Sequence, residues 1–290
     1  MEQFRGANAL VTGAAGGLGH YIARALAAEG VNLVLSDLPG APLDALSDEA
    51  RARGVRVETE AADLAQRSEA EDLVGRAENA LGPIDVLVNN AGLEFGGAFL
   101  DNTVDELERI VDVNLLAVML LTHQALPGML QRGRGHIVNL ASLAGKIAAP
   151  QLSSYAGTKH AVVGFTHSLR GEHASSPVGF SAICPAFVGR VGMYGRLEDE
   201  VPDPPSIFGP VPPEDVGAAV VKAIREDRAE LFVGHRALRP ISLVYHAAPK
   251  LFAKLSDSRR SREYSEAFAA VRKRHADPED PTAPDPPDAS

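Results

Sequence analysis

Short β-branched runs alternate with longer segments of helical period over the first 235 residues of the chain. Several of the short runs are apolar throughout, which is typical of strands buried on both faces of a parallel sheet. The predicted strands span residues 8–12, 31–36, 55–60, 84–89, 135–140, 179–184 and 229–234, and the predicted helices span 18–29, 42–53, 67–81, 103–131, 153–174 and 213–227. This alternation predicts an α/β fold, a doubly wound domain with a seven-stranded, mainly parallel sheet and helices on both faces.

Two regions depart from this alternation. Residues 186–213 are rich in Gly and Pro and too long for an ordinary connection, which predicts a functional loop or lid. Residues 240–275 are first apolar and then strongly charged, and we expect them to form a C-terminal helical extension. Residues 276–290 are acidic and rich in Pro, a composition typical of disordered tails. The predicted organisation is a main domain over residues 1–239, followed by the extension and the tail.

The extension begins with an apolar stripe at helical spacing. Such a stripe favours packing on the domain or on another subunit. The alternative is contact with a membrane surface through residues 241–262, because Arg259, Arg260 and Arg262 follow the stripe. Two glutamates that come next dilute this basic cluster.

Composition and charge exclude some classes of function. The 290 residues are 45% hydrophobic and 23% charged, as in an ordinary globular protein. The formal net charge is −10, and five of the acidic residues lie in the last fourteen positions. The rest of the chain lacks the clustered basic face that a nucleic acid requires, so we expect no nucleic-acid partner.

Cys184 is the only cysteine, so the chain cannot form an internal disulfide, which favours a reducing compartment. The N-terminus lacks the basic start and apolar core of a signal peptide. No apolar run approaches the ~20 residues that span a bilayer. We therefore expect a soluble, cytoplasmic protein without a transmembrane segment.

A glycine-rich turn, "TGAAGGLG", joins the first predicted strand to the first helix. Glycines at such a turn let backbone N–H groups approach a pyrophosphate, and the helix N-terminus favours its negative charge. The spacing differs from the common G-x-G-x-x-G fingerprint, but the place between strand and helix favours a nucleotide site over a plain tight turn. The candidate contacts are Gly13, Gly16, Gly17, Leu18 and Gly19.

Asp37 ends the second predicted strand, about 20 residues after the glycines. A carboxylate there can accept hydrogen bonds from the ribose hydroxyls of an adenosine and would repel a 2′-phosphate. Leu38 follows it, and no Lys or Arg lies in the glycine turn, which favours NAD over NADP. The alternative is that Asp37 only starts the following turn.

Tyr155 and Lys159 are four positions apart on a predicted helix, so both side chains point to one face. A neighbouring ammonium stabilises a phenolate, so the pair could pass a proton. Ser142 follows the preceding strand, where the carboxyl edge of a sheet opens into a ligand crevice. Its hydroxyl could polarise a substrate oxygen beside the tyrosine.

Together these residues resemble the short-chain dehydrogenase/reductase family over about residues 5–235. The matching motifs are "TGAAGGLG" (12–19), "DL" (63–64), "NNAG" (89–92), Asn114, Ser142 and "YAGTK" (155–159). The resemblance implies a Rossmann-type fold and an NAD(P)-dependent oxidoreductase that transfers hydride between a nicotinamide and an alcohol or ketone.

The resemblance also implies a role for each matched residue. Tyr155 would be the general acid and base, Ser142 would hold the substrate oxygen, and Lys159 would bind the nicotinamide ribose and lower the tyrosine pKa. Asn114 would anchor a water that relays protons. The remaining cofactor contacts would be Asp63 and Leu64 at the adenine, and Asn90, Ala91 and Gly92 along the cofactor.

One stretch departs from the family pattern. Where the family commonly reads P-G-x-V-x-T, this chain reads "PAFVGR", with Arg190 in the place of the threonine. We expect backbone groups near Pro185 and Val188 to bind the nicotinamide carboxamide instead. Arg190 would reach a phosphate, a substrate carboxylate or only solvent.

The expected walls of the substrate pocket are mostly apolar or aromatic, which favours a lipophilic secondary alcohol or ketone. Glu94, Phe187 and Met193 are the candidate substrate contacts besides Ser142 and Tyr155. The other expected wall residues are Leu93, Phe95, Leu143, Ile147, Val191, Tyr194 and Phe208, while Glu94 and Lys146 could serve a polar group. Two rival functions stay open: an NADPH-dependent carbonyl reductase and a non-catalytic nucleotide-binding scaffold.

The resemblance further implies a homodimer or homotetramer formed through the helices at 103–131 and 153–174. The second of these helices carries small residues that allow close helix contact: Ala156, Gly157, Ala161 and Gly164. We expect no metal site, because His160, His167 and His173 lack the spacing of a helical zinc pair.

Overall fold

The computed structural model describes residues 4–195, 199–202, 204, 206–250, 263–264, 266–268 and 270–271. The predicted tail (276–290) and the basic cluster of the extension lie outside these residues, so tail disorder and membrane contact stay predictions.

Seven strands form one sheet within the described residues, in the order β3-β2-β1-β4-β5-β6-β7. Every neighbouring pair is parallel. The strands are β1 (Asn8–Thr12), β2 (Asn32–Asp37), β3 (Val57–Ala61), β4 (Val86–Asn89), β5 (Gly135–Leu140), β6 (Val178–Pro185) and β7 (Glu230–Val233). All residues of β1, β4, β5 and β6 are buried, as the continuous apolar runs predicted. The predicted doubly wound fold is confirmed.

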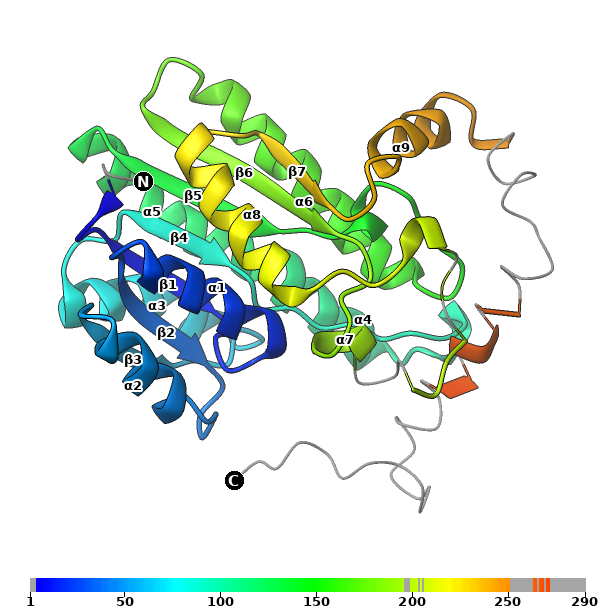
Figure 1. Cartoon of the computed structure of the whole chain (residues 1–290), viewed down its shortest axis with the longest axis horizontal. Helices are drawn as coiled ribbons and strands as arrows, with labels where there is room; N and C mark the ends of the chain where they lie inside the picture. The colour runs from blue at the N-terminus through cyan, green and yellow to red at the C-terminus, as the bar shows by residue number, and fades with distance from the viewer. Residues whose placement is uncertain are drawn as a thin grey trace.

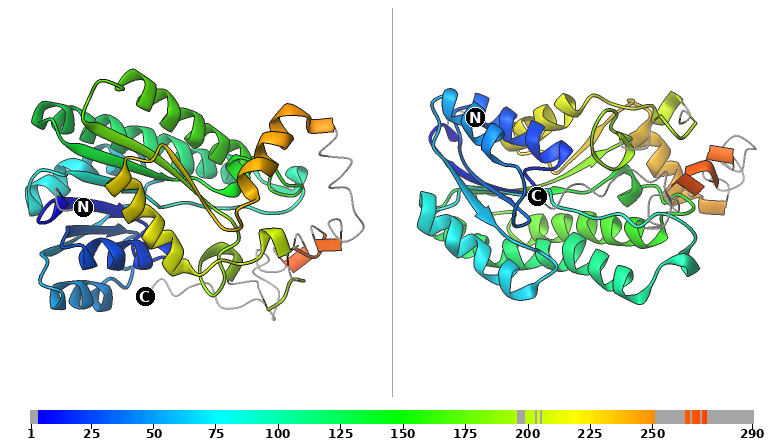
Figure 2. Two further views of the ribbon diagram at one scale, coloured as in Figure 1. Left: turned by 45° about the horizontal axis from the view of Figure 1, so that its top comes forward. Right: turned by 90° about the horizontal axis from the view of Figure 1, so that it is seen from below.

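Helices cover both faces of the sheet (Figures 1 and 2). One face packs against α1, α2 and α8, and the other packs against α3, α5 and α6. The α-helices among the described residues are α1 (Gly17–Ala28), α2 (Asp44–Ala52), α3 (Arg67–Leu81), α4 (Val104–Val111), α5 (Ala117–Arg132), α6 (Ser153–Glu172), α7 (Gly192–Gly195), α8 (Pro213–Glu226) and α9 (Leu238–Ala247). The last of these crosses the predicted domain boundary at residue 239, which stays a prediction.

The segment predicted as one helix over 103–131 is divided by a π-helical turn, η3 (Asp112–Leu116). Ala117 N–H donates to the carbonyl oxygen of Asp112, five residues back, so the helix widens here. Such turns are frequent at functional sites, and Asn114 lies inside this one. An apolar period shows that the segment is helical but does not reveal a single widened turn.

The whole run Val104–Arg132 has 29 residues and a mean hydropathy of 1.4 in its most apolar window. Among the described residues, it is the one helix that meets the length and composition of a membrane span, so the expected absence of a transmembrane segment stays a prediction. Ala117, Leu121, Ala125 and Met129 are buried in one core with strands of the sheet. A helix buried in the core of a sheet domain meets the same criteria of length and composition.

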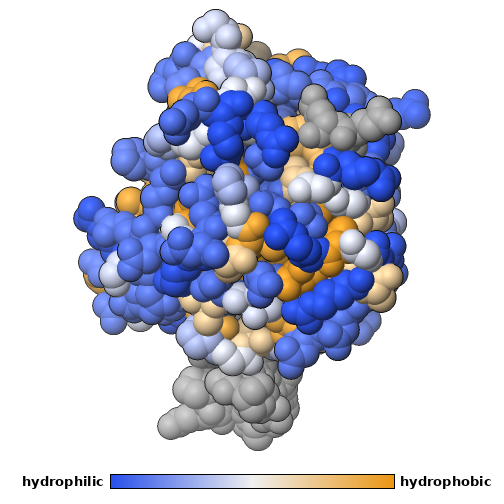
Figure 3. Space-filling view, turned by 90° about the vertical axis from the view of Figure 1, so that its left-hand side faces the viewer, coloured by the Kyte–Doolittle hydropathy of each residue, from blue (hydrophilic) through white to orange (hydrophobic). Residues whose placement is uncertain are grey.

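The loop predicted over 186–213 connects β6 to α8. It is held to itself by the backbone, because Val211 N–H donates to the Phe187 carbonyl at 2.8 Å. It contains α7 and a short 3-10 turn, η5 (Ser206–Phe208). The loop crosses the carboxyl ends of the strands. The opposite side of the molecule, on the left in Figure 1, is mostly hydrophilic with small apolar patches (Figure 3).

Candidate active site

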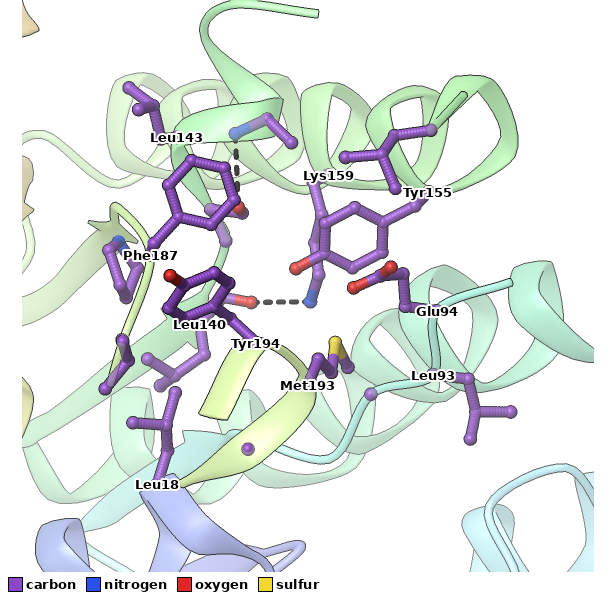
Figure 4. A pocket seen from close by; sticks show the side chains of 18 of the residues that line it. Leu18, Leu93, Glu94, Leu140, Leu143, Tyr155, Lys159, Phe187, Met193 and Tyr194 are labelled. Carbon is purple, nitrogen blue, oxygen red and sulfur yellow. Dashed lines mark hydrogen bonds between the residues drawn. The ribbon is translucent and has the colours of Figure 1, made fainter. Parts of the chain in front are cut away.

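A cavity of about 1380 Å³ opens at the carboxyl ends of the strands. Its walls come from the glycine turn, the ends of β2, β4, β5 and β6, the start of α6 and the loop before α8. This is the crevice where a doubly wound sheet binds its ligands. Figure 4 shows the part that contains Tyr155 and Lys159.

Two glycines of the turn lie where a side chain would not fit. Gly13 has a φ of +64°, and a Cβ there would lie 2.8 Å from the Cα of Ala91. A Cβ on Gly17 would lie 2.6 Å from the backbone nitrogen of Gly192 in the loop before α8. Gly13, Gly16, Gly17 and Leu18 line the cavity.

Gly19 does not line the cavity. A Cβ on Gly19 would collide with the carbonyl oxygen of Gly13, so this glycine lets α1 pack against the turn. Its predicted contact with the cofactor stays a prediction.

The Asp37 carboxylate lies between the end of β2 and the glycine turn. It accepts the N–H of Ala15 at 2.8 Å and that of Leu38 at 2.8 Å. Both Asp37 and Leu38 line the cavity. The alternative that Asp37 only starts a turn accounts for its bond to Leu38 but not for its bond to the glycine turn. Farther along this edge, Asp63 accepts the N–H of Ala65 at 3.0 Å, and Asp63 and Leu64 also line the cavity.

The "NNAG" stretch is tied to the glycine turn. Asn90 Nδ2 donates to the carbonyl oxygens of Thr12 at 2.9 Å and Gly13 at 3.0 Å. The hydroxyl oxygen of Thr12 accepts the N–H groups of Asn90 and Ala91, each at 3.1 Å. These bonds hold the ends of β1 and β4 together at the cavity, which Asn90, Ala91 and Gly92 line.

Tyr155 and Lys159 lie one turn apart on α6 and both point into the cavity (Figure 4). Lys159 Nζ donates to the carbonyl oxygen of Leu140 at 2.8 Å. The side chain is buried, and this burial lowers the pKa of Lys159 to about 8. The site therefore holds an amine whose pKa is well below that of an exposed lysine.

Ser142 begins a 3-10 turn, η4 (Leu143–Gly145), directly after β5. Its Oγ accepts the N–H of Ala144 at 3.1 Å. This contact fixes the side chain and leaves the hydroxyl proton available to a ligand in the cavity. The structure thus brings Ser142, Tyr155 and Lys159 to one cavity, as the sequence predicted.

Asn114 is fully buried and does not line the cavity. Its amide donates to the Leu93 carbonyl at 2.8 Å and to Thr158 Oγ1 at 3.1 Å, and it accepts the N–H of Leu93 at 2.7 Å. Asn114 therefore fixes the wall segment after β4 against α6. Its predicted role as a water anchor stays a prediction.

Pro185 and Val188 line the cavity where the carboxamide contacts were expected. Arg190 does not line it: its guanidinium pairs with the Glu214 carboxylate at 2.6 Å, and both side chains are more than half exposed. This surface ion pair is not among the destinations that the sequence left open for Arg190, namely a phosphate, a substrate carboxylate or only solvent.

The candidate substrate contacts Glu94, Phe187 and Met193 surround Tyr155 and Lys159, together with Tyr194 (Figure 4). The other expected wall residues also line the cavity, except Phe95. Lys146 is not part of the lining, because it forms an ion pair with Glu230 at 2.8 Å.

Sequence reasoning missed the wall that the C-terminal extension supplies. Its lining residues are Tyr245, Pro249, Tyr264, Glu266 and Phe268. The i, i+4 spacing of Tyr264 and Phe268 was the available signal, because it places two aromatic rings on one helix face. Arg109 on α4 also lines the cavity and was not predicted.

These residues fit a nicotinamide dinucleotide. Gly13 and Gly17 leave no room for side chains, Asp37 places a carboxylate where a ribose diol is expected, and Lys159 lines the same cavity. A metal site has less support, since no group of three or more His, Cys, Asp or Glu side chains gathers in the part of the chain that the structure describes.

Comparison with known proteins agrees with this geometry. The sequence model described as "short chain dehydrogenase" matches residues 7–201. The ketoacyl reductase HetN of Nostoc sp. is 37% identical over 238 residues, which cover 82% of this chain and 82% of that protein.

Two solved structures share the fold. A short-chain dehydrogenase/reductase from Burkholderia phymatum in complex with NAD is 30% identical, with a TM-score of 0.75, over 87% of this chain and 96% of that one. A variant of actinorhodin polyketide ketoreductase with NADPH is 31% identical, with a TM-score of 0.72, over 82% of this chain and 98% of that one. The chain thus belongs to the short-chain dehydrogenase/reductase family, whose members are NAD(P)-dependent oxidoreductases acting on CH–OH groups.

Proposed function

We propose that this protein transfers hydride between NAD and a lipophilic secondary alcohol or the corresponding ketone, with Tyr155 as the general acid and base. One observation carries the proposal: Tyr155, Lys159 and Ser142 line the same cavity as the glycine turn and Asp37. A non-catalytic nucleotide-binding scaffold would have no need of that catalytic set.

The proposed preference for NAD rests on Asp37. A carboxylate held against the glycine turn would repel a 2′-phosphate, and the neighbouring residues Ala14, Ala15 and Leu38 provide no cation. The two structural relatives contain NAD in one case and NADPH in the other, so the local charge carries this choice. Because one of these relatives contains NADPH, an NADPH-dependent carbonyl reductase is the second candidate function.

The proposed substrate class rests on the lining. Leu143, Ile147, Phe187, Met193 and Phe208 present apolar surface. The name of the relative HetN, a ketoacyl reductase, supports a carbonyl group on an acyl chain. We therefore favour a substrate with an extended apolar part.

When bound, the dinucleotide accepts or supplies the hydride. The Ser142 hydroxyl donates a hydrogen bond to the substrate oxygen, since its own Oγ already accepts from Ala144. Tyr155 takes the proton from that oxygen during alcohol oxidation and returns it during ketone reduction. In its charged form, Lys159 favours the phenolate of Tyr155.

Solvent would supply and remove this proton through a water at Asn114. Both polar atoms of the Asn114 amide are bonded within the protein. We therefore assign the water contact to the backbone of the π-helical turn.

The test is a screen of alcohols of different length with NAD, read as NADH absorbance, in the natural protein and in Tyr155→Phe. We expect turnover to fall by about 10²–10⁴-fold in the variant, because the ring stays and the titrating hydroxyl is lost. Full turnover by Tyr155→Phe would remove the proposed mechanism. Cofactor binding should be unchanged within about twofold and serves as the control for folding.

We also propose self-association through α4, α5 and α6. Val104, Val111 and Met119 expose apolar side chains on the first two helices. A Cβ on Gly157 or Gly164 would meet nothing within 4 Å, so the surface of α6 is open to a close neighbour. Light scattering on the purified protein tests this, and a monomer at micromolar concentration would contradict it.

A further inference from the structure

The described part of the C-terminal segment, residues 263–264, 266–268 and 270–271, packs against the loop before α8. Phe268 and Val271 are 5% and 3% exposed, and they share one apolar cluster with Tyr194 and Val201 of that loop. The short helical pieces of this segment are drawn in red-orange in Figures 1 and 2. They lie beside the loop in space, although they are far from it in the sequence. Burial of this degree shows that the segment is part of the folded core around the cavity.

Aromatic rings join the two segments. The ring of Phe187 lies 5.0 Å from that of Tyr194 and 5.8 Å from that of Tyr264, the latter edge to face. Tyr264 in turn stacks on Phe268 at 6.1 Å. All four of these residues line the cavity, so the aromatic contacts form a continuous part of its wall.

The Tyr264 hydroxyl oxygen is buried, and it has no hydrogen-bond partner in the described part of the chain. Buried hydroxyl groups of tyrosine usually have one. Burial, together with Tyr194 and Glu94, raises the pKa of Tyr264 well above its ordinary value. The group therefore stays protonated at physiological pH and can act only as a hydrogen-bonding group, not as an acid or base.

We propose that Tyr264 and Phe268 form part of the outer wall of the substrate pocket and that both select the substrate. Phe268 limits the length of its apolar part, and Tyr264 donates a hydrogen bond to a second oxygen, remote from the reacting carbon. This proposal rests on the proposed function and narrows it: the substrate is an apolar alcohol or ketone of limited length that carries a second oxygen.

The first experiment measures binding without turnover. Straight-chain methyl ketones from butanone to dodecan-2-one are titrated by calorimetry into protein saturated with oxidised NAD, which cannot reduce them. We expect affinity to rise with length and then fall in the natural protein. In Phe268→Ala the optimum should move by about two to four methylene groups, because the wall retreats. Phe268→Leu should give a smaller shift and covers the case in which the alanine variant does not fold.

The matched control is Leu243→Ala in α9. This side chain belongs to the same C-terminal region, is 66% exposed and does not line the cavity. Its length profile should equal that of the natural protein. An unchanged profile in both Phe268 variants would overturn the proposal, as would a shift of equal size in the control.

The second experiment compares decan-2-one with its analogue that carries a terminal hydroxyl group, and repeats the comparison along the series. At one chain length, the natural protein should bind the hydroxylated ketone about tenfold more tightly than the ketone without the hydroxyl group. Tyr264→Phe should remove this preference and leave the affinity for the plain ketone unchanged. Equal loss of affinity for both ketones, or no loss, would contradict the role of Tyr264.

Failure of the proposed function would be visible separately. It would appear as turnover that survives Tyr155→Phe, whereas the binding profiles do not depend on turnover. If no ketone binds the natural protein, gain of binding in Phe268→Ala supports the wall, and absence of binding in both proteins overturns it.

Discussion

Lys159 Nζ lies 5.7 Å from the centre of the Tyr155 ring, on the same face of α6. The ammonium can stabilise a phenolate only while it is charged. Burial opposes that charge and brings the Lys159 pKa down to about 8. The side chain that serves the proposed chemistry therefore reduces the stability of the fold.

Lys159→Met should lose activity and gain stability. The pKa of Lys159 is about 8 in the folded protein against an ordinary 10.5, so below pH 8 both states hold the proton and the folded state bears the whole cost of the buried charge. Methionine keeps the apolar stem. We expect the free energy of unfolding to rise by on the order of 1–3 kcal/mol at pH 7.

This gain should shrink as the pH rises from 8 toward 10.5, because the folded natural protein then releases its proton before the unfolded chain does. Urea unfolding of both proteins at pH 7 and pH 10 measures the difference. Lys222→Met, at an exposed position of α8, is the control and should show no such trend. A variant less stable than the natural protein at pH 7 would refute the argument.

The cofactor preference should reverse in the double variant Asp37→Ser, Leu38→Arg. Serine removes the repulsion of a 2′-phosphate, and arginine supplies a cation beside it. We expect the ratio of NADPH to NADH affinity to rise by about 100-fold, equivalent to about 3 kcal/mol. Fluorescence titration with each dinucleotide measures the ratio. Asp48→Ser, at a carboxylate that is 80% exposed on α2, should leave the ratio unchanged.

His136 should make the fold sensitive to acid. It is buried, with Nε2 2.8 Å from Ser181 Oγ, and burial lowers its pKa from 6.5 to about 4. Between these values the unfolded chain holds a proton that the folded protein does not, so stability is lost as the pH falls through that window, by on the order of 3 kcal/mol in total.

Replacing His136 with Gln should flatten this dependence even if stability at pH 7 falls. The measurement is the difference between the free energies of unfolding at pH 7 and pH 4.5. His123→Gln, at an exposed position of α5, should keep the slope of the natural protein. The same slope in His136→Gln would show that other groups cause the acid sensitivity.

Gly17→Ala should weaken cofactor binding and lower stability together. The added Cβ would lie 2.6 Å from the backbone nitrogen of Gly192 and 2.7 Å from Cβ of Val191, so the loop before α8 would have to move. Overpacking of this kind costs about 1–3 kcal/mol. Thermal unfolding and NADH titration measure the two effects. Gly75→Ala in α3, where a Cβ would meet nothing within 4 Å, should be neutral or stabilising.

The sequence predicted the strands, most helices and most of the residues that line the cavity at the glycine turn and the strand ends. Those features depend on local signals: continuous apolar runs, a glycine turn, and a tyrosine and a lysine at helical spacing. The sequence could not show that Gly19 packs beneath the turn, because close packing and contact with a ligand both require a glycine.

The remaining features depend on contacts between distant segments. The partner of Arg190 is Glu214, across a loop that has no regular period. The π-helical turn at Asn114 changes one hydrogen bond and leaves the apolar period nearly intact. Phe268 packs in one cluster with Tyr194, and nothing in the sequence of either segment indicates that the other is its neighbour.

The close approach of Gly17 to Gly192 links the two halves of the cavity. The glycine turn is proposed to hold the dinucleotide, and the loop that carries Gly192 also carries Phe187 and Tyr194 of the substrate wall. A ligand that displaces the backbone of the glycine turn changes the conformational energy of the loop that carries Gly192, and the reverse also holds. The affinities for cofactor and substrate should then be coupled, and by thermodynamic reciprocity each ligand should change the dissociation constant of the other by the same factor.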